Sequence, residues 1–258
     1  MQLWHTAGLA FFVYVVAVAG LSPARRRQLG RVLTGSAIGA MVVLGSAIEG
    51  QPGWLAHWVS PAAVLLIAYW TSGLLFTAPD FQQERLLVCL DARLNVRRLA
   101  CRTPRALAEV FEFGYAAVYL LVPLALLIRH AYLQHPDPHG FWSVILITDF
   151  ICFAMLPWVQ TRPPRALEGE APWNSRFRRF NVRLLGSTSI QANTFPSGHA
   201  AEGLAAALLI TGAPMAILLM MCAGAIAVSA GAVLGRYHYF GDALAGWTVA
   251  LGVWMVLR

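Results

Sequence analysis

Eight apolar runs, most of them close to the length that a helix needs to cross a bilayer, constrain this chain more than any other feature. A transmembrane helix takes about 20 apolar residues, and the chain is 58% hydrophobic and only 12% charged. Since soluble domains carry about 25% charged residues, the runs predict an all-α polytopic transmembrane helical bundle of about eight spans. The expected spans are 3–21, 31–48, 54–76, 106–129, 141–159, 198–213, 214–234 and 239–257.

Two connecting segments are longer than turns. In the first, 77–105, leucines recur on one helical face, and Glu84, Asp91 and arginines recur on the opposite face. This pattern predicts an interfacial amphipathic helix that lies on the membrane, with Asp80 capping its first turn. The second segment, 160–196, has prolines and six arginines but no sustained apolar period. A loop of this length is usually functional or disordered.

All nineteen basic residues are arginines, and the net charge is +7. Because no soluble basic domain is present, the charge indicates contact with anionic lipid rather than nucleic acid. Segments 22–31, 77–105 and 160–197 hold four, six and six arginines, whereas Arg129 and Arg258 fall at the opposite face. By the positive-inside rule, the arginine-rich face is cytoplasmic. No pair of the four cysteines has a metal-ligand spacing, so we expect reduced thiols.

Three short polar stretches stand at the ends of the last four spans. They are TRPPR (161–165), FPSGHA (195–200) and GRYHYFGD (235–242). If the sixth and seventh spans form a hairpin that turns at Gly212-Ala213-Pro214, an even number of crossings separates the stretches. All three then lie at one membrane face.

The second stretch has the features of an anion site. Ser197 and Gly198 lead into a helix N-terminus, where free backbone N–H groups and the positive end of the dipole favour a bound anion. Gly198 allows close approach of a ligand to the backbone, and Ser197 adds a hydroxyl donor. His199 falls in the first turn, beside the position expected for the anion.

The third stretch supplies a second histidine. His238 and Asp242 are four residues apart and share a helical face, so the carboxylate can orient the ring and leave the other nitrogen free as nucleophile or base. Arg162, Arg165 and Arg236 offer planar donor groups that suit phosphate oxygens. Together these residues predict a phosphoryl-transfer site that needs no metal and no cofactor.

These stretches resemble the type 2 phosphatidic acid phosphatase family of membrane enzymes. The family pattern is K-x6-R-P, then P-S-G-H, then S-R-x5-H-x3-D, and here R-P, P-S-G-H and H-x3-D are complete. The resemblance implies that His238 is the nucleophile, that Asp242 orients it and that His199 protonates the leaving alcohol. It also implies that Arg162 and Ser197 hold the phosphate.

Two positions depart from that pattern. The lysine position is Met155, and the arginine position before the second histidine is Ala232. Arg165 and Arg236 are the nearest replacements. The branch that contains sphingomyelin and inositol phosphorylceramide synthases also keeps both histidines and the aspartate while relaxing the other cations. The resemblance covers the last half strongly and 54–140 loosely, so we expect 1–50 to form two additional N-terminal spans before a phosphatase/phosphotransferase-like domain at 51–258.

Further polar residues fall inside or beside the expected spans. Asp149 is an intramembrane acid, which by default indicates function; the alternative is a structural, hydrogen-bonded acid. Glu112, Tyr115 and Tyr119, at helical spacing, are candidates for a headgroup or acceptor pocket, or else pair with linker arginines. Glu202, one turn after His199, is a candidate for tuning that histidine.

We therefore expect a membrane lipid phosphatase that acts on a lipid phosphate or pyrophosphate through a phosphohistidine. The alternative is a lipid phosphotransferase that passes a phosphoryl-headgroup to an alcohol. A non-enzymatic transporter or scaffold is a remote third possibility, because transporters place polar sites at the midplane rather than at span ends. We expect an integral protein of the bacterial inner membrane. Charge places the site in the cytoplasm, whereas the family resemblance places it in the periplasm or lumen; the oligomeric state is open.

Overall fold

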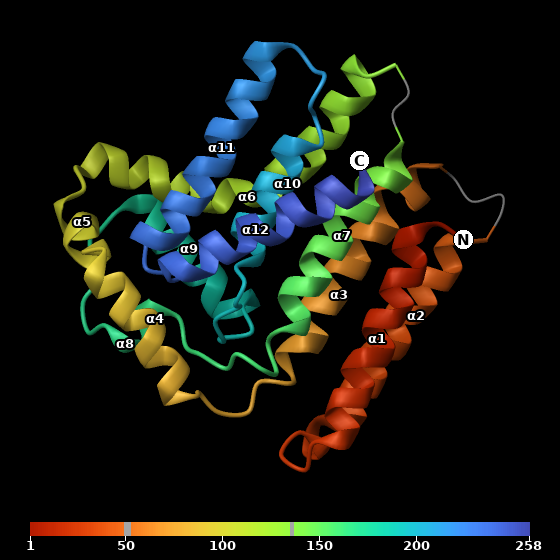
Figure 1. The fold of residues 1–258 in the computed structure, drawn as a ribbon, viewed down its shortest axis with the longest axis horizontal. Coiled ribbons are helices and arrows are strands. Elements are labelled where there is room, and N and C mark those ends of the chain that lie inside the picture. Colours follow the sequence, from red (N-terminus) through yellow and green to blue (C-terminus); the bar gives the residue numbers. More distant parts are fainter. Residues whose placement is uncertain (49–52, 135–136) are drawn as a thin grey trace.

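The computed structural model describes residues 1–48, 53–134 and 137–258 as helices and loops, with no strand among them. Figure 1 shows the order of the helices along the chain. Their bounds are α1 Leu3–Leu21, α2 Leu29–Ser46, α3 Ser60–Gly73, α4 Phe81–Arg93, α5 Val96–Arg102, α6 Arg105–Tyr132, α7 Pro138–Ala154, α8 Pro164–Leu167, α9 Arg176–Thr188, α10 Gly198–Leu208, α11 Met215–Leu234 and α12 Phe240–Leu257. A 3-10 turn, Arg26–Gln28, precedes α2, and a π-helical turn, Leu55–Val59, precedes α3.

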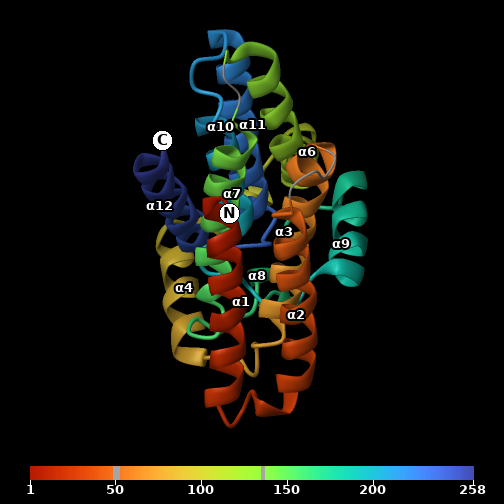
Figure 2. The same cartoon turned by 90° about the vertical axis from the view of Figure 1, so that its right-hand side faces the viewer.

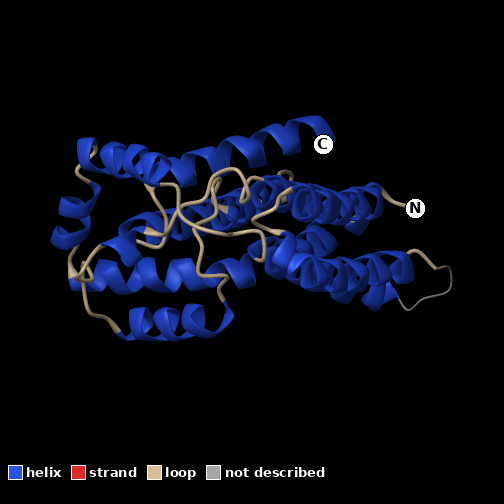
Figure 3. Ribbon diagram, turned by 90° about the horizontal axis from the view of Figure 1, so that it is seen from below, coloured by secondary structure: helices blue, strands red, loops and turns tan. Residues whose placement is uncertain are grey.

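The short helix α10 lies at the centre of the bundle, packed against α6, α7, α11 and α12. The α1–α2 hairpin packs against α3 and α7 and forms one edge of the molecule (Figure 1). Figure 2 shows α4 and α9 on opposite flanks. Seen from below, loops cross in the middle of the ring of helices (Figure 3). These loops carry the three polar stretches.

Small residues allow the central helices to approach closely. A Cβ on Gly246 of α12 would lie 2.5 Å from the Ser197 carbonyl oxygen at the start of α10. A Cβ on Gly231 of α11 would lie against the Phe111 carbonyl of α6. Gly212 has a φ of +103°, which glycine adopts without strain, and turns the chain between α10 and α11 as predicted.

In the part of the chain that the structure describes, five helices are long and apolar enough to cross a membrane. They are α1, α2 with its preceding turn, α6, α11 and α12. Helix α7 is apolar but has 17 residues. Helix α3 has 14 residues after a π-helical turn, and α10 has 11, about 17 Å at 1.5 Å per residue. The expected count of about eight spans is therefore not confirmed.

The amphipathic helix expected within 77–105 is divided into α4 and α5. Asp80 caps α4 as predicted, since its side chain accepts the backbone N–H groups of Gln82 and Gln83. Asn95 adopts a left-handed conformation, with φ at 53°, and separates the two helices. Glu84 and Asp91 are buried against the protein, while several leucines of the opposite face are exposed. The predicted position of these helices on a membrane surface stays a prediction.

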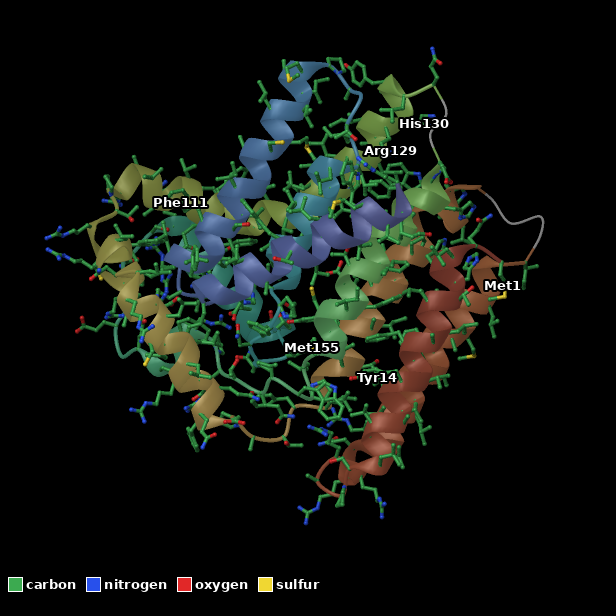
Figure 4. All side chains as sticks on the ribbon, in the orientation of Figure 1. Met1, Tyr14, Phe111, Arg129, His130 and Met155 are labelled. Atoms are coloured by element: carbon green, nitrogen blue, oxygen red, sulfur yellow. The ribbon has the colours of Figure 1, made fainter. Side chains whose placement is uncertain are left out.

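The two ends of the bundle differ in chemistry. Figure 4 shows Arg129 and His130 at the end of α6 that lies far from α4 and α8. Arg129 donates to the Leu209 carbonyl at 2.5 Å, which ties α6 to the end of α10. The three polar stretches lie toward the other end, with α4, α5 and α8.

Candidate active site

Backbone hydrogen bonds join the three polar stretches in pairs. The Asn193 N–H donates to the Thr161 carbonyl at 2.9 Å, which links the first stretch to the segment directly before the second. The Arg165 N–H donates to the Arg236 carbonyl at 2.9 Å, which links the first stretch to the third. The second and third stretches are joined where the Ser197 N–H donates to the Asp242 carbonyl at 2.9 Å. Segments far apart in sequence thus form one site.

His238 lies just before α12, with Asp242 in the first turn of that helix. Asp242 Oδ2 accepts the Tyr239 N–H at 2.8 Å and lies 3.5 Å from His238 Nδ1. Nδ1 has no hydrogen-bond partner among the described residues, so the two groups are in contact without a formed hydrogen bond. Contacts of catalytic pairs often tighten only when substrate binds. The Tyr239 N–H holds the buried carboxylate beside Nδ1. This geometry leaves Nε2 as the nitrogen that can act on a ligand.

His199 lies in the first turn of α10, and its ring centroid is 6.0 Å from that of His238. The His199 ring stacks on Tyr115 at 5.0 Å, with 7° between the planes. Tyr115 stacks in turn on Tyr237 at 4.2 Å. The Tyr119 hydroxyl lies 3.5 Å from His199 Nε2. Aromatic neighbours from α6 and from the third stretch thus fix the plane of this imidazole.

Ser197 and Gly198 begin α10. Ser197 Oγ accepts the Ala200 N–H at 3.4 Å, so its buried hydroxyl is an N-cap. Gly198 lines the cavity described below, whereas Ser197 is not among its lining residues. The structure thus shows Ser197 capping the helix from behind the cavity, and the predicted contact of its hydroxyl with the phosphate stays a prediction.

The three candidate phosphate-binding arginines have different surroundings. Arg165 lines the cavity, with its guanidinium carbon 5.5 Å from the centre of the Tyr237 ring. Arg162 instead pairs with Glu84, since its Nε and Nη2 donate to the two carboxylate oxygens at 2.9 Å each. This guanidinium holds the pKa of Glu84 below its usual value.

Arg236 is buried and also engaged elsewhere. Its Nη1 donates to Asp91 Oδ2 at 2.6 Å, and its Nε donates to Glu168 Oε1 at 2.9 Å. Neither Arg162 nor Arg236 lines the cavity. Of the three arginines, the structure therefore brings only Arg165 to the histidines, and the other two fasten the motif loops to α4.

A cavity of about 380 Å³ connects these groups, within the size range of small-molecule sites. Its wall includes His199, His238 and Arg165 together with Asp149, Glu202 and aromatic and aliphatic side chains. Its lining residues are Leu65, Leu66, Tyr69, Trp70, Tyr115, Tyr119, Asp149, Phe153, Arg165, Leu184, Leu185, Thr188, Ser189, Ala192, Thr194, Gly198, His199, Glu202, Tyr237 and His238. The mixture suits an amphiphile.

Glu112 lies behind this cavity rather than in its wall. Its Oε1 accepts from Trp173 Nε1 at 2.8 Å and from Arg178 Nη1 at 2.9 Å. Its Oε2 accepts from Asn181 Nδ2 at 2.8 Å and from the Tyr237 hydroxyl at 2.6 Å. The carboxylate joins α6 to α9 and holds Tyr237. Its placement supports positioning of the site rather than contact with an acceptor.

The two departures from the family pattern also have defined places. Ala232 is fully buried in α11, and its carbonyl accepts the N–H groups of Tyr237 and His238 at 2.9 Å each. These bonds fix the turn that presents His238. Met155 is the C-cap residue of α7, and Figure 4 shows it away from the far end of the bundle marked by Arg129.

Several residues of this site were not singled out by sequence reasoning. Arg178 and Tyr237 are central to the network behind the histidines, and Tyr69 and Trp70 of α3 form part of the cavity wall. Arg178 looked like one of many linker arginines, and α3 looked like an ordinary span. The one local signal was the position of Tyr237 directly before His238.

Comparison with known proteins gives a family match over most of this site. The model of the PAP2 superfamily matches residues 84–256, which include α4 to α12 in whole or in part. No curated protein and no solved structure matches the chain. The match leaves the expected domain boundary near residue 50 as a prediction. It spans well over half of the chain, and the protein therefore belongs to the PAP2 superfamily, whose activities are of the phosphatase and phosphotransferase type.

Proposed function

We propose that this protein is a membrane lipid phosphatase that transfers a phosphoryl group from a lipid phosphate or pyrophosphate to His238 and then to water. The observation that carries the proposal is the pair of histidine rings, 6.0 Å apart at one cavity, with Asp242 behind one ring and Arg165 nearby. A nucleophile and a proton donor on opposite sides of one phosphoryl group are the arrangement that this chemistry needs.

In the first step, His238 Nε2 attacks phosphorus, so that a P–N bond forms as the P–O bond to the lipid breaks. Asp242 stabilises the positive charge that develops on the imidazole. His199 donates its proton to the leaving oxygen. Arg165 and the N–H groups at the start of α10 stabilise the equatorial phosphate oxygens.

In the second step, the neutral His199 accepts a proton from water, and the water oxygen attacks phosphorus. The P–N bond breaks, inorganic phosphate leaves, and both histidines return to their starting states. Because Arg165 and helix N–H groups provide the charge stabilisation, we propose that the reaction needs no divalent metal.

One feature of the structure bears on the choice between hydrolysis and transfer to an alcohol. Glu112, a candidate contact for an acceptor alcohol, has both oxygens occupied by protein donors and lies outside the cavity wall. Water needs no dedicated site. We therefore favour hydrolysis, although the departures at Met155 and Ala232 resemble the synthase branch and keep transfer as the alternative.

The test is release of inorganic phosphate from a panel of radiolabelled lipid phosphates, with and without acceptor alcohols, by purified protein. We expect free phosphate as the main product, retained activity in excess EDTA, and loss of activity in His238→Ala. Label that passes mainly into a new lipid would favour transfer. Full activity in His238→Ala would overturn the mechanism, and loss in EDTA that a divalent ion restores would overturn metal independence.

A further inference from the structure

Asp149 and Glu202 line the same cavity as the two histidines, and the phosphoryl transfer described above does not use them. Asp149 is 1% exposed, and its Oδ2 has no hydrogen-bond partner among the described residues. Its Oδ1 lies against the start of α10, 3.2 Å from where a Cβ on Gly198 would stand. Glu202 follows His199 by one turn of the same helix. Neither carboxyl group has an ion-pair partner in the part of the chain that the structure describes.

The acidic side chains that line the cavity, Asp149 and Glu202, outnumber its arginines. A buried carboxylate without a partner is costly, because protein of low polarity replaces its hydration. Arg165 is the one arginine among the lining residues, and a bound phosphate adds negative charge of its own. Two more acids at this cavity therefore favour a ligand that brings a positive group.

Aromatic rings line the same cavity as the acids. Tyr69 and Trp70 of α3, Tyr119 of α6 and Phe153 of α7 all contribute to the wall. The Tyr69 and Phe153 rings lie 5.6 Å apart and are tilted by 59°. Aromatic faces attract ammonium groups within about 6 Å of the ring centre. Acids together with aromatic rings are the chemistry that recognises an organic cation.

We propose that Asp149, Glu202 and these rings form a subsite for a protonated amine carried on the alcohol side of the phosphate ester. This inference rests on the proposed function, in which His199 protonates the leaving oxygen. Glu202 lies one turn after His199, and Asp149 lies against the neighbouring Gly198. The amine is therefore expected on the alcohol side of the ester. Leu65, Leu66 and Leu184 line the same cavity and suit an aliphatic chain. The substrate class is an amine-bearing lipid phosphate.

A divalent metal is the competing occupant of two carboxylates beside a phosphate. Magnesium requires near-octahedral oxygen coordination and usually keeps several waters. Among the described residues, no group of three His, Cys, Asp or Glu side chains is placed to hold a metal. The aromatic wall offers an ammonium group favourable contacts but offers a metal few ligands.

The experiment compares three substrates on purified wild-type protein. They are a long-chain amino-alcohol phosphate, its N-acetyl derivative, and the analogue in which a hydroxyl replaces the amine. We expect kcat/KM for the amine to exceed both others by about 30-fold, the lower end of what loss of one member of a buried charge pair costs. The hydroxyl analogue separates loss of charge from the added bulk of the acetyl group.

Two variants localise the effect. Asp149→Asn and Glu202→Gln should each reduce the ratio between the amine and hydroxyl substrates, because each removes a charge and keeps the side-chain shape. Equal kcat/KM of the wild-type protein for the amine and hydroxyl substrates would overturn the subsite. A preference for the amine that both variants retain, or that appears only with added magnesium, would also overturn it. Release of phosphate from none of the three substrates, or release that survives His238→Ala, would instead overturn the proposed function.

Discussion

Replacing Glu112 with alanine should destabilise the protein more than any other single change in α6 outside its apolar core. The carboxylate is fully buried, and it accepts hydrogen bonds from four side chains of α9, the adjoining loop and the third stretch. Without it, the Arg178 guanidinium, whose side chain is 8% exposed, is left buried without its carboxylate partner. Breaking a buried ion pair by removing one partner costs about 3–5 kcal/mol.

That free energy corresponds to a fall in Tm of about 10 °C for a chain of this size. The assay is thermal unfolding of detergent-solubilised protein in which Cys89, Cys101 and Cys222 are replaced by serine in every variant. Unfolding is followed by reaction of a fluorogenic thiol reagent with Cys152, which is buried until the bundle opens. Activity should fall as well, because Glu112 holds Tyr237, and Tyr237 stacks on Tyr115 beside His199.

The matched control is Glu109→Ala, one turn earlier on the same helix. Glu109 accepts the backbone N–H groups of Arg176 and Phe177 at the start of α9 and is not buried. Loss of such a capping contact costs about 1 kcal/mol. A Tm for Glu112→Ala within the range of this control would refute the assignment. A double variant, Glu112→Leu with Arg178→Met, should recover part of the loss, because no buried charge remains unpaired.

Three further predictions follow from the arginines and from the surface of the site. Arg165→Gln should lower kcat/KM about a hundredfold, whereas Arg162→Gln should act mainly on Tm; equal effects on kcat/KM would contradict the different places of these residues. Because the pKa of Glu84 is lowered from its usual value of 4.5, the ion pair with Arg162 stabilises the fold fully above pH 4.5. This stabilisation is lost as the pH falls through the lowered pKa. The Tm difference between wild type and Glu84→Gln should therefore shrink below pH 4.5, and a difference independent of pH would contradict this. The third prediction uses a cysteine introduced at the exposed Gly169, with the exposed native cysteines replaced by serine. If arginine charge sets the topology, this cysteine should resist labelling by a membrane-impermeant thiol reagent in intact cells. Labelling would place the site outside.

Features that depend on neighbours along the chain were predictable from the sequence. The Asp80 cap, the turn at Gly212 and the pairing of His238 with Asp242 all rest on spacings of a few residues, and the structure has each of them. The helix start at Ser197 is of the same kind. Local geometry fixes such contacts whatever the rest of the fold does.

Contacts between distant segments were not predictable in the same way. The spacing of Glu84 and Asp91 shows that they share a face of α4 but not whether that face meets water or protein. In the structure both acids are buried and pair with Arg162 and Arg236, two of the three arginines that sequence reasoning gave to phosphate. A guanidinium suits a carboxylate as well as a phosphate.

The expected number of spans was not confirmed for a related reason. The apolar run at 198–213 is rich in small residues, which serve close packing of α10 inside the bundle rather than length. Helix α10 is surrounded by α6, α7, α11 and α12 and ends at Leu208. Composition records that a segment is apolar, and it does not distinguish contact with lipid from contact with other helices.

Trapping of the phosphorylated enzyme tests the central claim most directly. Purified protein is mixed briefly with a phosphate substrate carrying labelled phosphorus and quenched in alkali, since phosphohistidine is labile to acid, and the label is then assigned to a peptide. We predict label on His238, absent from His238→Gln and formed more slowly in His199→Gln. Turnover of the substrate with no label on His238 at any time, or with label on a different residue, would contradict the account.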